Sequence, residues 1–323
     1  MPISFRKLAK RLLAPLLRKK HFDRKGGIYV LANPPEYLKA YYEYCTSILL
    51  ETTTFPGSGK LYLITVEFAG IISKRDKFVI IQYEHTIVSN EYIQGNNEIV
   101  CEINSGKYAG LLQARLLGTL KNYENALGVI EYSYSNVLHI EKSGFGYLYK
   151  DKAIYISPVF VEFSPRWMFE EKIHGCVTAF GDTNFGRRAE FLARLKSLKI
   201  KIENKSGNYN NYEALFGENS LLVNIHQTDL HSTLEELRVL PALACGLLVV
   251  SEESPFQDDL IYQDFIEFAR LDEMPFLLEK IAGLSAKELS NKFPRNKLGE
   301  IYSQLRENNL KEMNKIRTRI SGQ

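Results

Sequence analysis

The chain has 323 residues, of which 45% are hydrophobic, and carries a formal net charge of +3. This length favours two domains of ordinary size, and the hydrophobic share excludes an intrinsically disordered protein. Residues 1–25 hold nine of the 41 basic residues and one of the 38 acidic residues, so the remainder is mildly acidic. That distribution argues against a broad nucleic-acid-binding surface, and we expect no nucleic-acid partner.

The cysteines and the apolar runs bear on the compartment. The four cysteines are far apart and show no CxxC or Cys/His spacing, which indicates neither a zinc site nor a disulfide framework. No run approaches the roughly 20 apolar residues that span a bilayer, and the charged N-terminus is not typical of a signal peptide. These features predict a cytoplasmic protein.

The N-terminal arm, residues 1–25, is basic and amphipathic. Apolar residues from Phe5 to Leu16 recur at helical spacing, with lysines and arginines off that stripe. Such a helix can lie on an anionic membrane surface, which would attach the protein peripherally to the inner face of the membrane through residues 1–20. An ordinary terminal helix packed on its own domain fits the pattern equally well.

Residues 26–165 alternate short β-rich runs with helical stretches, which predicts an open α/β sheet. The segment 86–105 matches no regular element. The expected strands are 27–33, 61–68, 78–84, 127–133 and 153–159, and the expected helices are 36–50 and 110–120.

Residues 166–290 show the alternation more regularly, and residues 291–323 are helical and charged. The expected strands are 176–180, 199–203, 220–225, 246–250 and 264–269, and the expected helices are 185–198, 209–217, 232–245 and 272–282. Apolar runs of about five residues between helices indicate a parallel sheet that is buried on both faces. The right-handed crossover rule makes such a sheet Rossmann-like.

Two of these apolar runs end on polar residues, namely His226 after the first and Ser251 and Glu252 after the second. In an open parallel sheet, ligands bind beyond the carboxyl ends of the strands, so these side chains are expected to share that rim of the sheet. The helix between the runs is expected to begin near Thr233, whose hydroxyl suits an N-cap. Free N–H groups at a helix start favour phosphate.

Within that helix, Glu235 and Arg238 are three residues apart, so they can pair or contact the same ligand. Gly246 is expected to end the helix, and Pro241 is expected to break it into two short turns. These charged residues extend the polar rim beyond the strand ends themselves.

The sequence AFGDTNFGRR contains a second polar loop, which follows the strand predicted over residues 176–180. Gly181 and Gly186 let backbone N–H groups approach an anion, and Arg187 and Arg188 add charged donors in the first turn of the next helix. One interpretation is that a diphosphate lies between this loop and the one at 226–233. The alternative is that the arginines are solvated and the glycines only form turns.

Four segments, taken in chain order, resemble the C-terminal domain of glycosyltransferases with the two-Rossmann GT-B fold. They are FGxxNxxRR, NIH, LExxR and ALACGxxVVSE. These segments are most similar to bacterial and viral members of the group-1-like glycosyltransferases. Upstream, VIIQYEH and EYSYSNVLHIEKSGF resemble N-domain segments of such proteins. The likeness spans roughly residues 78–255.

This resemblance implies an α/β fold with two Rossmann-like domains facing a cleft. Residues 26–165 would form the acceptor domain, residues 166–290 the nucleotide-sugar domain, and residues 291–323 a helical segment that packs back on the N-domain. The implied activity is that of a hexosyltransferase in polysaccharide biosynthesis. It would move a sugar from a UDP-, GDP- or dTDP-linked donor to a glycan or a lipid-linked saccharide.

The polar rim and the resemblance together predict the residues that bind the donor. They are Gly181, Asn184, Arg187, Arg188, His226, Thr233, Glu235, Arg238, Ser251 and Glu252. Two features of many such enzymes are missing. The first is a pair of glutamates, at whose positions Thr233 and Pro241 stand, and the second is a D-x-D motif. The lack of D-x-D favours a metal-independent transferase with no cofactor, whose leaving diphosphate is neutralised by arginines and backbone amides.

An inverting transferase also needs a base that deprotonates the acceptor hydroxyl. Glu84 and His85 end a predicted strand of the first domain, so they are the predicted catalytic residues. The alternative for Glu84 is a structural hydrogen-bonding role, and His226 fits a structural position at a strand end as well as a donor-binding one.

Two other classes of function stay open. A dehydrogenase or methyltransferase would share a Rossmann-like sheet, but no G-x-G-x-x-G follows a predicted strand. A non-catalytic module that binds nucleotides or glycans on a degenerate GT-B scaffold is compatible with the missing glutamate pair.

Overall fold

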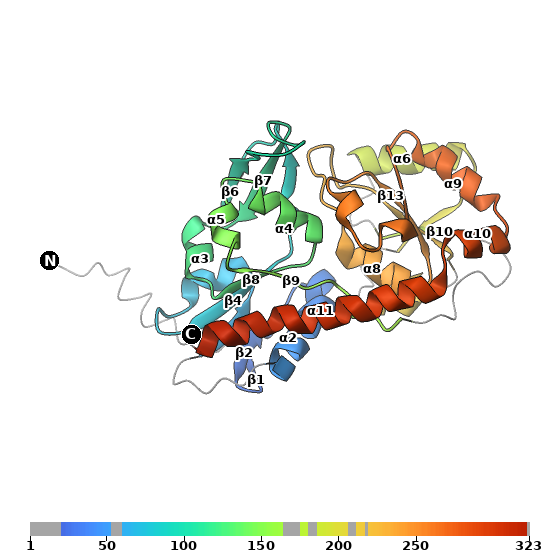
Figure 1. Cartoon of the computed structure of the whole chain (residues 1–323). Helices are drawn as coiled ribbons and strands as arrows, with labels where there is room; N and C mark the ends of the chain where they lie inside the picture. The colour runs from blue at the N-terminus through green and yellow to red at the C-terminus, as the bar shows by residue number, and fades with distance from the viewer. Residues whose placement is uncertain are drawn as a thin grey trace.

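The computed structural model describes residues 21–52, 60–163, 175–179, 186–205, 211–216 and 219–321. Within them the chain is an α/β protein with two Rossmann-like sheets, one in each half of the chain, surrounded by helices (Figure 1). The predicted arm over residues 1–20 lies outside the described residues, as do Gly181 and Asn184.

The N-terminal sheet has the strand order β1-β2-β3-β4-β8-β9, in which β1 is antiparallel to β2 and all other neighbours are parallel. Its strands are β1 (Phe22–Lys25), β2 (Ile28–Leu31), β3 (Leu61–Ile64), β4 (Lys77–Gln82), β8 (Gly128–Glu131) and β9 (Ala153–Tyr155). The helices of this half are η1 (Glu36–Leu38), α2 (Lys39–Thr52), η2 (Val66–Ile71), α3 (Leu120–Asn125), α4 (Tyr134–Glu141) and α5 (Gly146–Tyr149). Residues 22–25, predicted to belong to the N-terminal arm, are thus part of the sheet.

A small antiparallel sheet covers the segment 86–105, for which the sequence predicted no regular element, and the segment after it, which was predicted to be a helix. Its order is β5-β7-β6, with β5 (Ile87–Ser89), β6 (Glu98–Glu102) and β7 (Leu112–Leu117). The helix predicted over 110–120 is therefore wrong. Ala114 and Leu116 are fully buried while their neighbours are partly exposed, which is the alternation of a strand. Pairing with strands on both sides outweighs the helical propensity of Leu, Gln, Ala and Arg in this run.

The C-terminal sheet has the order β11-β10-β12-β13-β14, and all its strands are parallel. The strands are β10 (Cys176–Thr178), β11 (Ile202–Asn204), β12 (Leu221–Asn224), β13 (Leu248–Glu252) and β14 (Ile266–Ala269). The helices are α6 (Gly186–Ser197), α7 (Tyr212–Phe216), α8 (Glu236–Ala244), η4 (Gln257–Asp259), η5 (Gln263–Phe265), α9 (Met274–Ala282), α10 (Ala286–Lys292) and α11 (Arg295–Ser321). Every residue of the central strand β12 is buried, as expected for a parallel strand covered on both faces.

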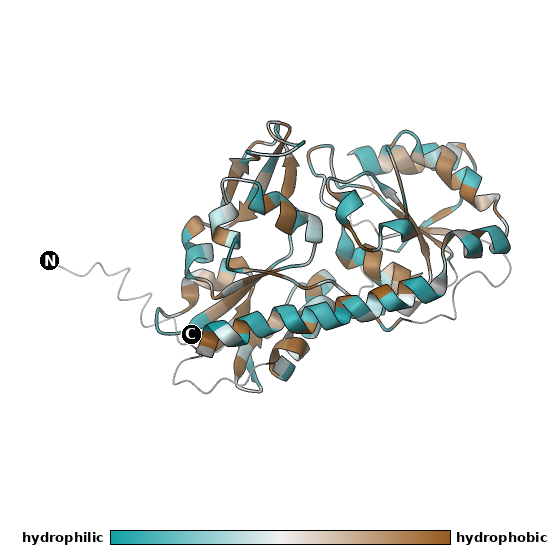
Figure 2. Cartoon of the chain, viewed as in Figure 1, coloured by the Kyte–Doolittle hydropathy of each residue, from teal (hydrophilic) through white to brown (hydrophobic). Residues whose placement is uncertain are grey.

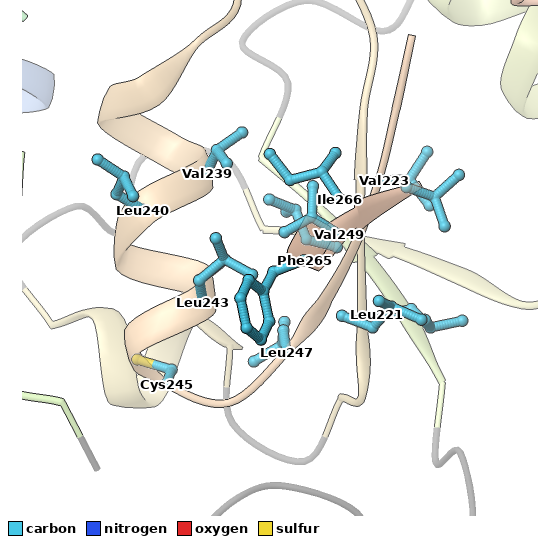
Figure 3. Packing of buried hydrophobic residues seen from close by; sticks show 14 of the residues in the cluster. Leu221, Val223, Val239, Leu240, Leu243, Cys245, Leu247, Val249, Phe265 and Ile266 are labelled. Atoms are coloured by element: carbon cyan, nitrogen blue, oxygen red, sulfur yellow. The ribbon is translucent and has the colours of Figure 1, made fainter. Parts of the chain in front are cut away.

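Helix α8 packs on this sheet, and Figure 3 shows its Val239 and Leu243 among the apolar side chains of β13 and of the segment before β14. The prediction that Pro241 breaks the helix is wrong, since α8 continues through it. One missing N–H donor is outweighed by the burial of this apolar face, where each aliphatic side chain contributes roughly 1.5–3 kcal/mol.

Helix α11 runs along both halves of the molecule (Figure 1). Leu298 and Tyr302 belong to the C-terminal core, whereas Met313 and Ile316 belong to the N-terminal core. Most of its surface is hydrophilic, in contrast to the brown strands of both sheets in Figure 2. Among the described residues no helix is both long enough and apolar enough to cross a membrane.

Candidate functional site

The predicted site residues lie at the carboxyl rims of the two sheets. Glu84 and His85 follow the last residue of β4 closely, and His226 comes two residues after the end of β12. Ser251 and Glu252 are the last two residues of β13. The carboxyl ends of parallel strands are where open α/β sheets bind their ligands, and contacts across the two halves bring both rims together.

Backbone hydrogen bonds join the two halves at this point. The N–H of Ser89 donates to the carbonyl of Leu230 (2.9 Å), and the N–H of Ser232 donates to the carbonyl of Ile87 (3.0 Å). The Thr233 hydroxyl accepts a hydrogen bond from the N–H of Ile87 (3.0 Å) and is fully buried. Strand β5 is therefore paired on both edges, with β7 on one side and with the loop before α8 on the other.

This arrangement corrects the predicted role of Thr233. Helix α8 starts at Glu236 with Glu235 at its N-cap position, and no side chain caps it. Thr233 lies before the helix and holds β5, so it is not an N-cap that leaves free N–H groups for a phosphate. Its tertiary partner, Ile87, is 146 residues away in sequence, beyond the reach of a local capping pattern.

A side-chain contact between the two rims joins His85 and Glu235. The Nδ1 atom of His85 lies 2.9 Å from Oε1 of Glu235, and the side chains are 13% and 16% exposed. The Tyr132 hydroxyl donates to the same carboxylate oxygen (3.4 Å). Burial acts to raise the pKa of Glu235, but His85, followed by Arg238 and Arg188, outweighs it and lowers this pKa to about 2. Glu235 is therefore an anion beside an imidazole.

Glu84, the second predicted catalytic residue, faces a different partner. Its Oε2 atom lies 3.6 Å from Nη1 of Arg115, and the pKa of Glu84 is raised because burial outweighs the opposing influence of Arg115 and His85. Arg115 also donates from Nε to Glu98 and from Nη1 to the carbonyl of His85 (3.1 Å). It thus fixes the chain at the end of β4 from the neighbouring sheet.

On the C-terminal rim, Arg187 and Glu252 bind each other. Two parallel hydrogen bonds of 2.8 Å run from Nη1 and Nη2 of Arg187 to the two carboxylate oxygens of Glu252. The Nε atom of Arg187 lies 2.8 Å from Oδ1 of Asp229. Burial acts to raise the pKa of Glu252, and the hydrogen bonds from Arg187 outweigh it and lower this pKa. Two residues predicted to bind the donor separately therefore form one bidentate pair.

Arg188 and Arg238 point to the ends of the central strands. Arg188 is buried, and its Nη2 atom donates to the carbonyl of Ile225 (3.4 Å). Arg238 donates from Nη1 to Oδ1 of Asn224 (2.8 Å), and the Asn224 amide donates to the hydroxyl of Ser251 (3.0 Å). The rim therefore carries two guanidinium groups near Glu235. A backbone carbonyl holds that of Arg188, and polar side chains hold that of Arg238.

Two histidines beside this rim are held by the protein itself. His226 donates from Nε2 to the carbonyl of Glu253 (2.9 Å), and its backbone N–H donates to Glu252 (2.9 Å). Burial lowers the pKa of His226, which favours a structural position at the strand end. The His231 ring lies 5.0 Å from that of His85, and burial, followed by the charge of His85, lowers the pKa of His231 to about 4.

Sequence reasoning missed several residues of this region. Arg115 lay in a segment predicted to be helical, and His231 and Asp229 stood in a loop without a recognisable motif. Asn224 ends the same apolar run that drew attention to His226, so a closer reading of strand ends would have identified it. Arg115 had no such signal, because only the pairing of β7 with β5 brings it to the end of β4.

No family model, no curated protein and no solved structure matches the chain. Across the part of the chain that the structure describes, no group of three or more His, Cys, Asp and Glu side chains is arranged to hold a metal ion.

Proposed function

We propose that this protein is a glycosyltransferase of the GT-B type. Its N-terminal half would bind a saccharide acceptor and its C-terminal half a nucleotide-sugar donor. The observation that carries the proposal is the 2.9 Å contact between His85 and Glu235, which joins the carboxyl rims of two Rossmann-like sheets. A carboxylate–imidazole pair at such a junction suits the removal of a proton from a bound hydroxyl.

The donor diphosphate would lie at the rim of the C-terminal sheet. A departing diphosphate gains negative charge in the transition state, and fixed guanidinium groups stabilise that charge. Arg188 and Arg238 are the candidates, since both influence Glu235 electrostatically and both are anchored at the carboxyl end of β12. Arg187 is engaged by Glu252 and Asp229, so we assign it to the support of these carboxylates.

His85 would act as the base. Glu235 keeps the imidazole proton on Nδ1, leaves Nε2 as the basic nitrogen and stabilises the imidazolium that forms. Nε2 would accept the proton of the acceptor hydroxyl while its oxygen bonds to the anomeric carbon and the bond from that carbon to the diphosphate oxygen breaks. This single displacement inverts the anomeric centre. Glu84 is the alternative base, and its contact with Arg115 favours a supporting role.

The first test is transfer and hydrolysis with UDP-, GDP- and dTDP-hexoses, measured as released nucleoside diphosphate with and without EDTA. His85→Gln should lower turnover at least about 100-fold, the usual contribution of a general base, and leave nucleoside diphosphate affinity unchanged. Arg188→Ala should weaken that affinity about tenfold, as expected for one lost charge-assisted contact.

His21→Gln provides a matched control, because His21 precedes β1, three strands away from β4 in the sheet. This variant should keep parental turnover. Unchanged turnover in His85→Gln would show that the base is misassigned. Nucleotide binding without turnover across the panel would favour the non-catalytic module, and no binding of any nucleotide would refute the proposal.

A further inference from the structure

A group of tyrosines and carboxylates lies along the carboxyl rim of the N-terminal sheet, beside the His85–Glu235 contact. Tyr37 follows β2, Glu67 follows β3, and Tyr83 and Glu84 follow β4. These three strands are consecutive neighbours in the sheet, so the four side chains come from adjacent positions on one rim. We call this group the tyrosine–carboxylate face.

The aromatic rings of this face are partly open to solvent. The ring centroids of Tyr37 and Tyr83 lie 6.1 Å apart at an interplanar angle of 55°, and Tyr37 is 45% exposed. The Tyr83 hydroxyl donates to Oε1 of Glu67 (3.5 Å). An exposed aromatic pair backed by a carboxylate offers both an apolar ring surface and hydrogen-bond acceptors to a ligand.

The electrostatic surroundings of Tyr37 are acidic. Burial raises the pKa of Tyr37, and the carboxylates of Glu84, Glu67 and Glu235, in that order, raise it further. The nearby cation of Arg115 is bound to Glu98 as well as to Glu84, so its charge is shared between two carboxylates. A phosphate or carboxylate placed on this face would meet like charge, whereas a hydroxyl or ammonium group would find acceptors.

Building on the proposed function, we propose that the tyrosine–carboxylate face binds the acceptor sugar and selects uncharged and amino sugars over uronates and phosphorylated sugars. A sugar ring that lies on Tyr37 and Tyr83 would place a hydroxyl toward His85, because Glu235, which contacts His85, is close enough to Tyr37 to influence it electrostatically. The acceptor is thereby assigned to a chemical class, which the proposed function alone leaves open.

Saturation-transfer NMR in the absence of donor tests the selectivity directly. The probes are methyl glucoside, methyl glucosaminide, methyl glucuronide and glucose 6-phosphate, each titrated into the full chain. We expect the first two to bind at least tenfold more tightly than the two anions. Glu67→Lys reverses one charge of the face and should lower the ratio of neutral-sugar to anionic-sugar affinity at least threefold.

Tyr37→Ala should weaken binding of the glucoside at least fivefold, because it removes half of the aromatic pair. The matched control is Tyr147→Ala, which removes a tyrosine that is 62% exposed on α5, outside this rim. It should bind the sugars as the parent does. Nucleoside diphosphate affinity, measured on the same samples, should be equal in parent and variants, which separates a lost sugar contact from unfolding.

The outcomes distinguish this inference from the proposed function. Equal binding of neutral and anionic sugars, or equal sugar binding in Tyr37→Ala and the parent, would overturn the acceptor assignment even if nucleoside diphosphates bind. The expected sugar preference without any nucleotide binding would support the tyrosine–carboxylate face and refute the transferase.

Discussion

Glu235 and Glu236 are adjacent in sequence, but their environments shift their pKa values in opposite directions. Glu235 faces His85 and two arginines, which lower its pKa to about 2. Glu236 is fully buried, accepts hydrogen bonds from the N–H of Tyr134 (2.7 Å) and the hydroxyl of Tyr155 (2.7 Å), and has a pKa that burial raises to about 7. The second glutamate therefore joins the two halves as a hydrogen-bonding group that stays protonated up to about pH 7.

The raised pKa of Glu236 predicts a pH-dependent stability. Between its ordinary pKa of 4.5 and about 7, the unfolded chain loses this proton while the folded protein keeps it, so the contribution of Glu236 to stability falls as pH rises through this range. The loss is on the order of 3 kcal/mol, since one pKa unit corresponds to about 1.4 kcal/mol. Glu236→Gln removes this contribution, so its free energy of unfolding relative to that of the parent should rise between pH 5 and 8 in urea unfolding experiments.

Glu279→Gln, which removes an exposed carboxyl of α9, is the control and should follow the parent across this range. Glu131 is also buried, and its pKa is raised to about 8, so the Glu236→Gln variant keeps part of the slope. His226 and His231 act in the opposite direction on the parent, because their lowered pKa values make stability rise with pH below about 6.5. A Glu236→Gln slope equal to that of the parent would therefore contradict the argument.

At the scale of single elements, the end of α8 shows a local signal that tertiary packing did not override. Gly246 has a φ of +83°, and its N–H donates to the carbonyl of Leu243 (3.0 Å). The N–H of Leu247 donates to the carbonyl of Ala242 (3.0 Å). This pair of hydrogen bonds is a Schellman motif, which requires a left-handed residue after the helix. The prediction that Gly246 ends the helix is confirmed.

Gly246→Ala should therefore destabilise the protein by about 1–2 kcal/mol, the cost of placing a side chain in the left-handed region. Chemical denaturation measures the change. The control is Gly70→Ala in η2, because a Cβ at Gly70 meets no atom within 4 Å and the backbone there is not left-handed. Equal stability of the two alanine variants would show that the turn after α8 relaxes without cost.

At the scale of the whole molecule, α11 fastens the two halves to each other. The Tyr302 hydroxyl donates to the carbonyl of Leu240 in the C-terminal half. The buried Asn309 amide accepts from the N–H of Ser157 (2.9 Å) and donates to its carbonyl (2.8 Å) and to the Tyr44 hydroxyl (2.9 Å) in the N-terminal half. The relative position of the two rims thus depends on a helix that contributes no residue to them.

Asn309→Ala should lower the free energy of unfolding by about 2–3 kcal/mol, because it leaves buried polar groups of Ser157 without partners. The matched variant Asn314→Ala removes an exposed amide further along α11 and should change stability by less than about 0.5 kcal/mol. Thermal and urea unfolding compare the two. An Asn309→Ala protein as stable as Asn314→Ala would mean that water replaces the lost hydrogen bonds.

Local chemistry controls part of this fold, and that part could be predicted from the amino-acid pattern. Short apolar runs between helices predicted the parallel strands of both sheets, though not the antiparallel strand β1, and a glycine without a Cβ marked the end of α8. The polar residues after those runs could be assigned to a rim, because parallel strands all end at the same edge of a sheet.

Only the tertiary structure decided what those residues contact. Thr233 binds Ile87 instead of capping a helix, Arg187 pairs with Glu252, and Arg115 reaches Glu84 because a segment with helical propensity became a strand between two partners. Such contacts join residues far apart in the chain, and their free energy comes from burial and pairing that exist only after folding. Neither these contacts nor their free energy can be read from the spacing of residues in the sequence.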